Sequence, residues 1–138
     1  MTIAVPCFNG AQALPISVNS LLAQTYHAVN LLIANDGSED ESLEIIKKFA
    51  AANNKIQYLD LPRNNASKTR NIILEKAKDY DFLCWCDCGD ELLPNAIFSM
   101  VYQAQLKQVN GSEKIVVLPL REIRTPNGKK CFTSKISR

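Results

Sequence analysis

Residues 83–94 read LCWCDCGDELLP, and the rest of the chain is organised around this stretch. Residues 81–86 are apolar and aromatic, lack glycine and proline, and are bounded by polar residues, which predicts a short buried strand. Asp87, Asp90 and Glu91 follow at once. Ligands of open parallel sheets bind beyond the carboxyl ends of the strands, so these acids are placed to hold a divalent cation against a phosphate. Acidic residues before a helix can also act simply as caps, and other parts of the chain must decide between these interpretations.

The composition is that of one globular domain. A chain of 138 residues with 46% hydrophobic and 22% charged residues can bury a proper core, which excludes disordered and fibrous classes. The net charge is +2 and no run of Lys or Arg exceeds a pair, which argues against a nucleic-acid partner. We see neither a basic, apolar leader nor an apolar run of membrane-spanning length, and expect no secretory signal and no transmembrane segment.

The five cysteines are best interpreted as reduced thiols. Cys84, Cys86 and Cys88 alternate along the predicted strand and its exit, so their side chains are expected on one face. The C-x-C-x-C run has no C-x-x-C and no paired histidine to complete a metal site. Trp85, within the same strand, is expected in the core. These features favour a cytoplasmic protein, with peripheral association at the inner face of the membrane left open.

Strands and helices alternate along the chain. Short apolar runs predict strands at residues 2–6, 29–34, 56–61 and 81–86. Helices are expected between and after them, and their predicted buried faces are Leu14, Val18, Leu21, Leu22 and Thr25; Leu43, Ile46 and Ala50; Ile73, Leu74 and Ala77; and Ile97, Met100, Val101 and Ala104. The alternation predicts an α/β, Rossmann-like fold, a mostly parallel sheet flanked by helices.

Two local signals refine this architecture. Ser38 and Glu41 have the spacing of a capping box for the second helix. Near the end of the chain, a strand is expected at residues 114–120. A turn signal, P-N-G-K at 126–129, lies between residues 122–124 and 131–133, which predicts a C-terminal antiparallel hairpin. We expect residues 1–138 to form a single domain.

Polar and aromatic residues of the kind that bind ligands lie at the ends of three predicted strands. They are Pro6, Phe8 and Asn9 after the first strand, Asp36 after the second, and Asp87 and Asp90 after the fourth. Because parallel strands end at one edge of a sheet, these residues are expected to share a cleft. The chain contains neither G-x-G-x-x-G nor G-x-x-x-x-G-K-[ST], so a dinucleotide fold and a P-loop are not supported. A nucleotide can still stack on Phe8 while Asp36 accepts a hydrogen bond from a base N–H.

Arg70 gives an independent indication of an anion. It shares the predicted buried face of Ile73 and lies in the first turn of its helix, near the same sheet edge. A buried guanidinium needs an anionic partner. Asp36, Asp87 and a bound phosphate are all candidates, and a purely structural ion pair remains an alternative.

Four motifs in order resemble those of inverting family 2 glycosyltransferases with the GT-A fold. They are VPCFN at 5–9, NDGSED at 35–40, NNASKTRN at 64–71 and WCDCGDELLP at 85–94. The resemblance runs in register from about residue 2 to residue 94. It implies a nucleotide-sugar donor, usually a UDP-sugar, and a hydroxyl acceptor such as a glycan, in the setting of cell-envelope polysaccharide synthesis.

The resemblance also implies roles for individual residues. Phe8 matches the aromatic beside the uracil and Asp36 the acid that reads the base, while Asp87 matches the first acid of the D-x-D element, which holds Mg²⁺ or Mn²⁺ on the diphosphate. The remaining residues expected at the donor are Pro6, Asn9, Ser67, Arg70, Asn71 and Cys88. Asp90 is the second candidate metal ligand, because Mg²⁺ manages with few carboxylates when phosphates complete its shell.

Three departures from the family pattern affect this interpretation. Asn35 stands where an acid is common, and Gly89 replaces the second D-x-D acid. The family's acceptor-binding half, with its general base, normally follows the region covered here, and Glu122 is only a placeholder for that base. We therefore expect the donor-binding half of a glycosyltransferase. The alternatives are a catalytically inactive nucleotide-binding or scaffolding domain and, less supported, a nucleotidyltransferase. A homodimer through the edge of the predicted hairpin and the apolar surface beside it is a further hypothesis.

Overall fold

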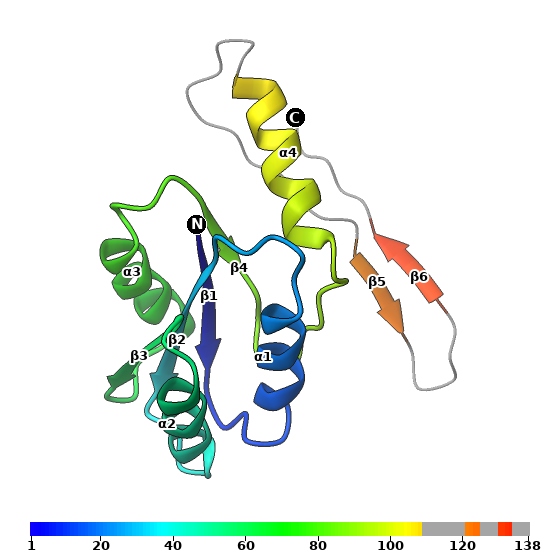
Figure 1. The fold of residues 1–138 in the computed structure, drawn as a ribbon. Helices are drawn as coiled ribbons and strands as arrows, with labels where there is room; N and C mark the ends of the chain where they lie inside the picture. The colour runs from blue at the N-terminus through cyan, green and yellow to red at the C-terminus, as the bar shows by residue number, and fades with distance from the viewer. Residues whose placement is uncertain (109–120, 125–129, 134–138) are drawn as a thin grey trace. The chain divides into compact units, whose positions relative to one another are not determined.

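A computed structural model describes residues 1–108, 121–124 and 130–133 of the chain (Figure 1). The chain divides into two compact units, Met1–Asn95 and Ala96–Arg138. The elements of the first unit are β1 (Thr2–Cys7), α1 (Leu14–Leu22), β2 (Asn30–Asp36), α2 (Ser42–Ala52), β3 (Ile56–Leu61), α3 (Ala66–Lys76) and β4 (Leu83–Trp85).

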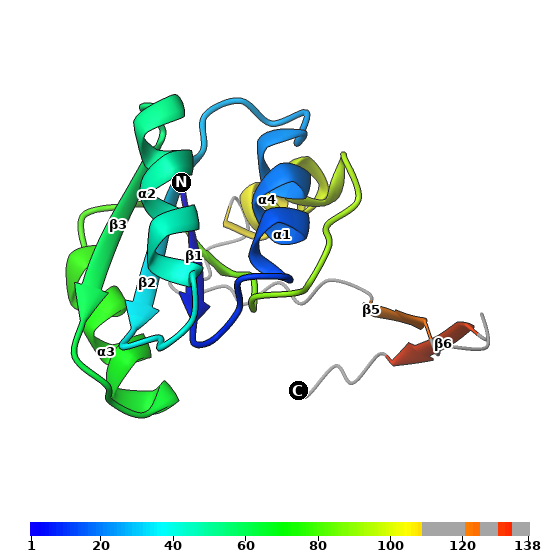
Figure 2. The ribbon, with the colours of Figure 1, turned by 90° about the horizontal axis from the view of Figure 1, so that it is seen from below.

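The first unit is built on a parallel sheet with the strand order β3-β2-β1-β4. Ala4 of β1 lies opposite Leu32 of β2 on one side and opposite Trp85 of β4 on the other. Because every neighbouring pair is parallel, the carboxyl ends of all four strands lie at one edge of the sheet. Figure 2 shows the same elements seen from below. The predicted mostly parallel sheet is confirmed.

Helices cover both faces of this sheet. Ile73 of α3 packs with Ala4, Leu32 and Ala34, which point to one face. The alternate residues of β1 and β2 point to the other face, where right-handed crossovers place α1 and α2 (Figures 1 and 2). The fully buried side chains associated with this second face are Ile3, Val5, Ile33, Leu14, Val18 and Ile46. A central strand covered on both sides explains the uninterrupted apolar run of β2.

The predicted helices form, but some of their predicted inward positions are wrong. Leu22, Thr25 and Leu74 are exposed, Leu74 by 48%. Helix α1 ends at Leu22, so the chain beyond it no longer follows the helical period. Gln24 is buried instead, and its side-chain amide donates to the Leu93 carbonyl at 2.8 Å.

The predicted capping box is also wrong. Helix α2 begins at Ser42, and its N-cap residue, Glu41, makes no side-chain capping bond. The Ser38 hydroxyl instead accepts a hydrogen bond from the Asn9 amide at 3.0 Å. The Asp40 carboxylate accepts from the Ser42 amide at 3.0 Å and so meets part of the helix start. A tertiary contact between two loops has replaced the local cap.

Strand β4 is shorter and less buried than predicted. It covers Leu83–Trp85 rather than residues 81–86. Trp85 is 36% exposed, so its expected place in the core is wrong. The physical reason is that β4 lies at the edge of the described sheet and pairs with β1 alone.

The second unit contains α4 (Ala96–Gln108), β5 (Arg121–Arg124) and β6 (Lys130–Thr133). Ile97, Val101 and Ala104 are buried along one face of α4, as predicted, and β5 and β6 pair antiparallel as the predicted hairpin. The strand expected at 114–120 and the turn at 126–129 lie outside the described residues.

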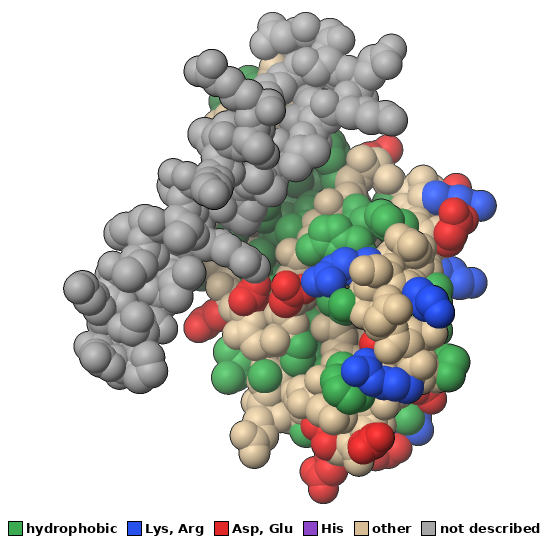
Figure 3. All heavy atoms as spheres, turned by 180° about the vertical axis from the view of Figure 1, so that it is seen from behind, with side chains coloured by type: hydrophobic (Ala, Val, Ile, Leu, Met, Phe, Trp, Pro, Cys, Tyr) green, Lys and Arg blue, Asp and Glu red, His purple; other side chains and the backbone are tan. Residues whose placement is uncertain are grey.

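The described surface carries charges of both signs. Figure 3 shows acidic and basic side chains interspersed over the described part of the face opposite to that of Figure 1. Among the helices that the structure describes, none is long and apolar enough to cross a membrane.

Candidate functional site

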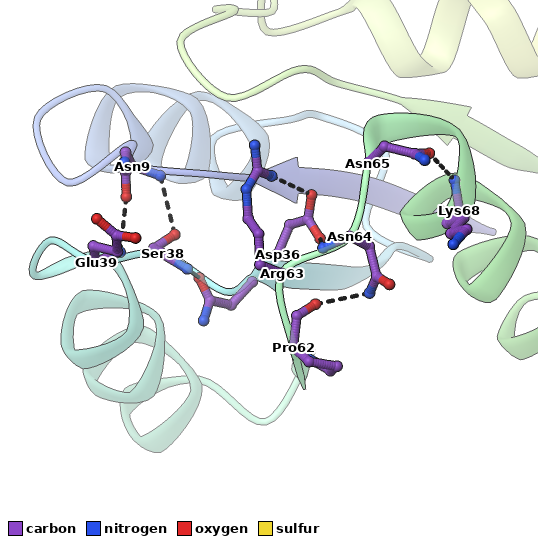
Figure 4. Close-up of polar contacts among 10 residues, drawn as sticks. Asn9, Asp36, Ser38, Glu39, Pro62, Arg63, Asn64, Asn65 and Lys68 are labelled. Atoms are coloured by element: carbon purple, nitrogen blue, oxygen red, sulfur yellow. Dashed lines mark hydrogen bonds and ion pairs between the residues drawn. The ribbon is translucent and has the colours of Figure 1, made fainter.

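The loops that follow β1 and β2 are tied together by Asn9. Its backbone has a positive φ of 48°, which aims both its amide and its side chain at the neighbouring loop. The Asn9 amide donates to Ser38 Oγ at 3.0 Å, and Asn9 Oδ1 accepts from the Glu39 amide at 2.8 Å (Figure 4). This predicted site residue therefore fixes the loop that carries Phe8.

Asp36 joins the end of β2 to the loop after β3. Its side chain is only 6% exposed. One carboxylate oxygen accepts from the Asn64 amide at 2.9 Å, and the other pairs with Arg63 Nη1 at 2.9 Å (Figure 4). The approach of the two loops requires Gly37, which has a φ of 65°, because a Cβ there would lie 2.5 Å from the Arg63 backbone nitrogen.

Arg63 completes a group that we call the base slot, made of Phe8, Asp36, Arg63 and Asn64. The Arg63 guanidinium carbon lies 3.4 Å from the centre of the Phe8 ring, a cation–π contact. Phe8 is nevertheless 41% exposed. The guanidinium lies in van der Waals contact with one face of the ring, so a planar base can stack on that face only if Arg63 moves.

Sequence reasoning did not single out Arg63 and Asn64. Both follow β3, whose carboxyl end adjoins that of β2 at the same sheet edge. The sequence did contain a signal for them. In a parallel sheet the polar loop at 62–67 must reach this edge, and Arg63 is the only cationic residue in that loop before α3 begins. Asn35, where the family often has an acid, is buried and donates to Asp60 Oδ1 at 2.8 Å.

A second group, the acid corner, consists of Arg70, Trp85, Asp87 and Asp90. Arg70 Nη2 lies 2.7 Å from Asp87 Oδ1, so of the anionic partners considered for Arg70 the structure shows Asp87. The guanidinium also lies 5.7 Å from the centre of the Trp85 ring. Both ionic partners are partly open to water, with side-chain exposures of 39% and 50%. Arg70 is thus less buried than the helical pattern predicted.

The turn after Asp87 accounts for the missing second acid. The Asp90 amide donates to the Asp87 carbonyl at 2.9 Å, which closes the turn. Gly89 adopts a φ of 102°, which residues with side chains adopt only under strain, and its amide donates to Ser17 Oγ at 2.8 Å. The conformation of this turn therefore requires glycine at position 89.

The acid corner fits a divalent cation only as a partial site. Within the described part of the chain, no three His, Cys, Asp or Glu side chains gather to hold a metal. Asp87 is half exposed and one of its oxygens is paired with Arg70. Mg²⁺ is commonly held by one or two carboxylates plus the phosphates of a substrate, so Asp87 and Asp90 fit a site that a diphosphate completes.

The remaining predicted donor residues lie on the same elements. Pro6 is half-buried in β1 opposite Ala34, and Ser67 and Asn71 are exposed on α3. The Asn65 side chain caps α3 by accepting from the Lys68 amide at 3.0 Å (Figure 4). Contact of Pro6, Ser67 and Asn71 with a donor stays a prediction.

The thiols Cys7 and Cys88 meet beside the same sheet edge. A hydrogen bond from the Cys88 thiol lowers the pKa of Cys7 to about 7, and the same contact raises the pKa of Cys88. Burial raises the pKa of Cys84. None of the cysteines at 7, 84, 86 and 88, which the structure describes, forms a disulfide.

Comparison with known families identifies the chain. The model of the family described as "Glycosyl transferase family 2" matches residues 2–113, most of the sequence. The chain belongs to this family. The predicted membership is confirmed, and the match includes every residue of the base slot and the acid corner.

Known relatives agree with this assignment. The chondroitin synthase of Pasteurella multocida is 31% identical over 97 residues, which cover 70% of this chain and 10% of the synthase. A structure of S. aureus TarS 1–349 with UDP-GlcNAc has a TM-score of 0.61 and 24% identity, covering 78% of this chain and 31% of that one. The mannosyltransferase PcManGT from Pyrobaculum calidifontis, solved with GDP-Man and Mn²⁺, has a TM-score of 0.63 and 17% identity, covering 70% and 30%.

These similarities confirm the GT-A-type fold, and they also define the extent of the chain. It spans a tenth of the synthase and about a third of the two solved chains.

Proposed function

We propose that this chain forms the donor-binding part of an inverting glycosyltransferase that uses a UDP-sugar. The observation that carries the proposal is the buried Asp36 carboxylate beside the partly exposed Phe8 ring, at the carboxyl edge of the sheet. A uracil has a ring face that can stack on Phe8 and a ring N–H that can donate a hydrogen bond to the Asp36 carboxylate. Family membership and the UDP-GlcNAc bound to TarS support the same donor class.

Donor binding requires the base slot to open. The Arg63 guanidinium covers Phe8 and neutralises Asp36. When a base enters, Arg63 leaves the ring, and Asp36 exchanges a charge-assisted hydrogen bond with arginine for one with the base. The Asn64 amide remains on the other Asp36 oxygen and keeps the carboxylate oriented.

The diphosphate binds at the acid corner in this proposal. Arg70 is the cation placed to bind phosphate oxygens once it releases Asp87, and Asp87 with Asp90 would hold Mg²⁺ or Mn²⁺. The bound cation would offset the charge that develops on the leaving diphosphate. The Mn²⁺ in the PcManGT structure supports this assignment.

The acceptor is proposed to be a hydroxyl, for example of a growing glycan of the cell envelope. An inverting displacement needs a general base for that hydroxyl, worth roughly 10²- to 10⁴-fold in rate. We assign no residue to this role. We further propose a cytoplasmic location, in keeping with the free thiols, and a homodimer, which sedimentation at high concentration tests.

Calorimetric titration tests the proposed donor. UDP and GDP are titrated in the presence of Mn²⁺ and again with a chelator, and uridine is titrated alone. We expect UDP to bind more tightly than GDP. We also expect the chelator to weaken the binding of UDP and to leave the binding of uridine unchanged. Absence of UDP binding under every condition would contradict the proposal.

One observation favours a second candidate function. Glycine in place of the second D-x-D acid, together with the Arg70–Asp87 pair, fits an inactive domain that binds nucleotide without using a metal. UDP binding that is indifferent to Mn²⁺ and chelator would support this alternative and reject metal-assisted transfer.

A further inference from the structure

The side chains of Cys7, at the end of β1, and Cys88, in the turn after β4, meet next to residues of the base slot and the acid corner. Ala4 pairs with Trp85, and the Cys86 amide donates to the Ala4 carbonyl at 3.0 Å, so the pairing continues beyond the end of β4. Cys7 is the last residue of β1, and Cys88 lies in the turn two residues beyond Cys86.

Gly10 shows how closely the two sulfur atoms approach. A Cβ on Gly10 would lie 2.5 Å from Cys88 Sγ and 3.0 Å from Cys7 Sγ, so both sulfurs pack on the same glycine. The Cys88 thiol also lies 3.8 Å from the Gly10 carbonyl and hydrogen-bonds to Cys7. Because both sulfurs lie within 3.0 Å of the same point, only a modest movement of the two side chains is needed to bring them to bonding distance.

We propose that Cys7 and Cys88 are an oxidation site, which a hydroperoxide converts into an intramolecular disulfide. The Cys7 thiolate attacks one peroxide oxygen, the O–O bond breaks, and the released hydroxide takes up a proton to become water. The Cys88 sulfur then attacks the resulting Cys7 sulfenic acid and displaces the second water. The two thiols lose two hydrogens, and one hydrogen peroxide is reduced to two waters.

The surroundings favour this pair over the other thiols. The hydrogen bond from Cys88 lowers the pKa of Cys7, which raises the fraction of the nucleophilic thiolate. Cys88 is half-buried, so a small hydroperoxide can reach the pair from its side. Cys84 donates to the Trp85 carbonyl at 3.6 Å and Cys86 to the Asp90 carbonyl at 3.7 Å, and neither packs on Gly10.

The disulfide would act on the acid corner, a consequence that rests on the proposed function. Cys88 directly follows Asp87, and the Gly89 turn follows Cys88. A covalent link from Cys88 to β1 holds Asp87 in its ligand-free position beside Arg70. Oxidation is therefore expected to weaken diphosphate binding while leaving uridine binding in place.

Peptide mapping tests the modification without any nucleotide. The protein is treated with hydrogen peroxide, free thiols are alkylated, and an endoproteinase that cuts before aspartate is applied without reduction. Cys7 then lies in residues 1–35 and Cys88 alone in residues 87–89, whereas Cys84 and Cys86 share residues 81–86. We expect a cross-link between 1–35 and 87–89. A link from 87–89 to 81–86, or peroxide-treated protein without a link at Cys7, would overturn the proposal.

Variants connect the modification to binding. Peroxide is expected to weaken UDP binding about tenfold in the wild-type chain, reversibly with dithiothreitol, but not in Cys7→Ser. Cys84→Ser is the matched control and should behave as wild type. Circular dichroism checks that Cys7→Ser is folded, and Cys88→Ser, read out by mapping alone, should lose the cross-link. If the cross-link forms but neither the oxidised nor the reduced protein binds UDP, the disulfide proposal stands and the proposed donor site is rejected.

Discussion

The base slot and the acid corner each contain one Arg–Asp ion pair, yet the two pairs differ in burial. Asp36 is 6% exposed and also accepts a backbone amide, whereas Asp87 is 50% exposed and is held by Arg70 alone among the contacts described here. Partly buried carboxylates with several hydrogen bonds are fixed in position, while exposed pairs contribute only about 0–1 kcal/mol. The base slot is therefore built before the ligand arrives, and the acid corner is left to be completed by the diphosphate.

The largest effect on UDP binding is expected from Asp36→Asn. The substitution removes the charge that pairs with Arg63 and the acceptor offered to the base, so UDP affinity should fall about 100-fold, or ~2.7 kcal/mol. Calorimetric titration measures the change. Asp81→Asn, an exposed acid before β4, is the matched control. Equal affinity of Asp36→Asn and wild type would show that the base does not bind at Asp36.

Substitutions at two glycines test how tightly each region is packed, Gly37 next to the base slot and Gly89 in the acid corner. Gly37→Ala combines a positive φ with a backbone clash at 2.5 Å, and should cost about 3 kcal/mol of unfolding free energy. Gly89→Ala has a positive φ but its nearest contact is 3.5 Å away, so the cost should be about 1 kcal/mol. Urea denaturation measures both. Similar losses in the two variants would contradict the difference in packing.

Asp87→Asn should affect binding only when metal is present. Removing the charge of the main expected metal ligand should weaken UDP binding about tenfold in Mn²⁺, and by little in chelator, because Arg70 is then free to bind phosphate. Calorimetric titration of UDP in Mn²⁺ and in chelator gives the ratio of the wild-type and variant affinities under each condition. A loss of the same size in chelator would instead indicate that Asp87 acts through Arg70.

The smallest effect is expected from Arg63→Ala, and it has the opposite sign. The base must displace an ion pair whose arginine is half-exposed and a cation–π contact, each worth roughly 0.5–1 kcal/mol, so their removal should tighten UDP binding about fivefold. Uridine should tighten equally, because the contact lies in the base slot. Weaker binding would mean that Arg63 moves to contact the bound base.

The fold was largely predictable because local patterns agreed with it. Strand β3 lies where the apolar run at 56–61 predicted it, and the alternation of strands and helices predicted the parallel sheet. The failures occurred where tertiary contacts replaced local ones. Ser38 has the spacing of a cap but bonds to Asn9, and Trp85 looks like a core residue but lies at the edge of the described sheet.

The sequence by itself determined the α/β class, the family and the residues at the strand ends, because periodicity and motif order are properties of the chain. It placed Phe8, Asp36 and Asp87 at a common edge, since parallel strands must end together. Only the tertiary structure decided which partners these residues have: Arg63 on Phe8 and Asp36, Arg70 on Asp87, and Cys88 on Cys7. Such contacts depend on how loops from separate strands meet, and no local pattern encodes the distance between them.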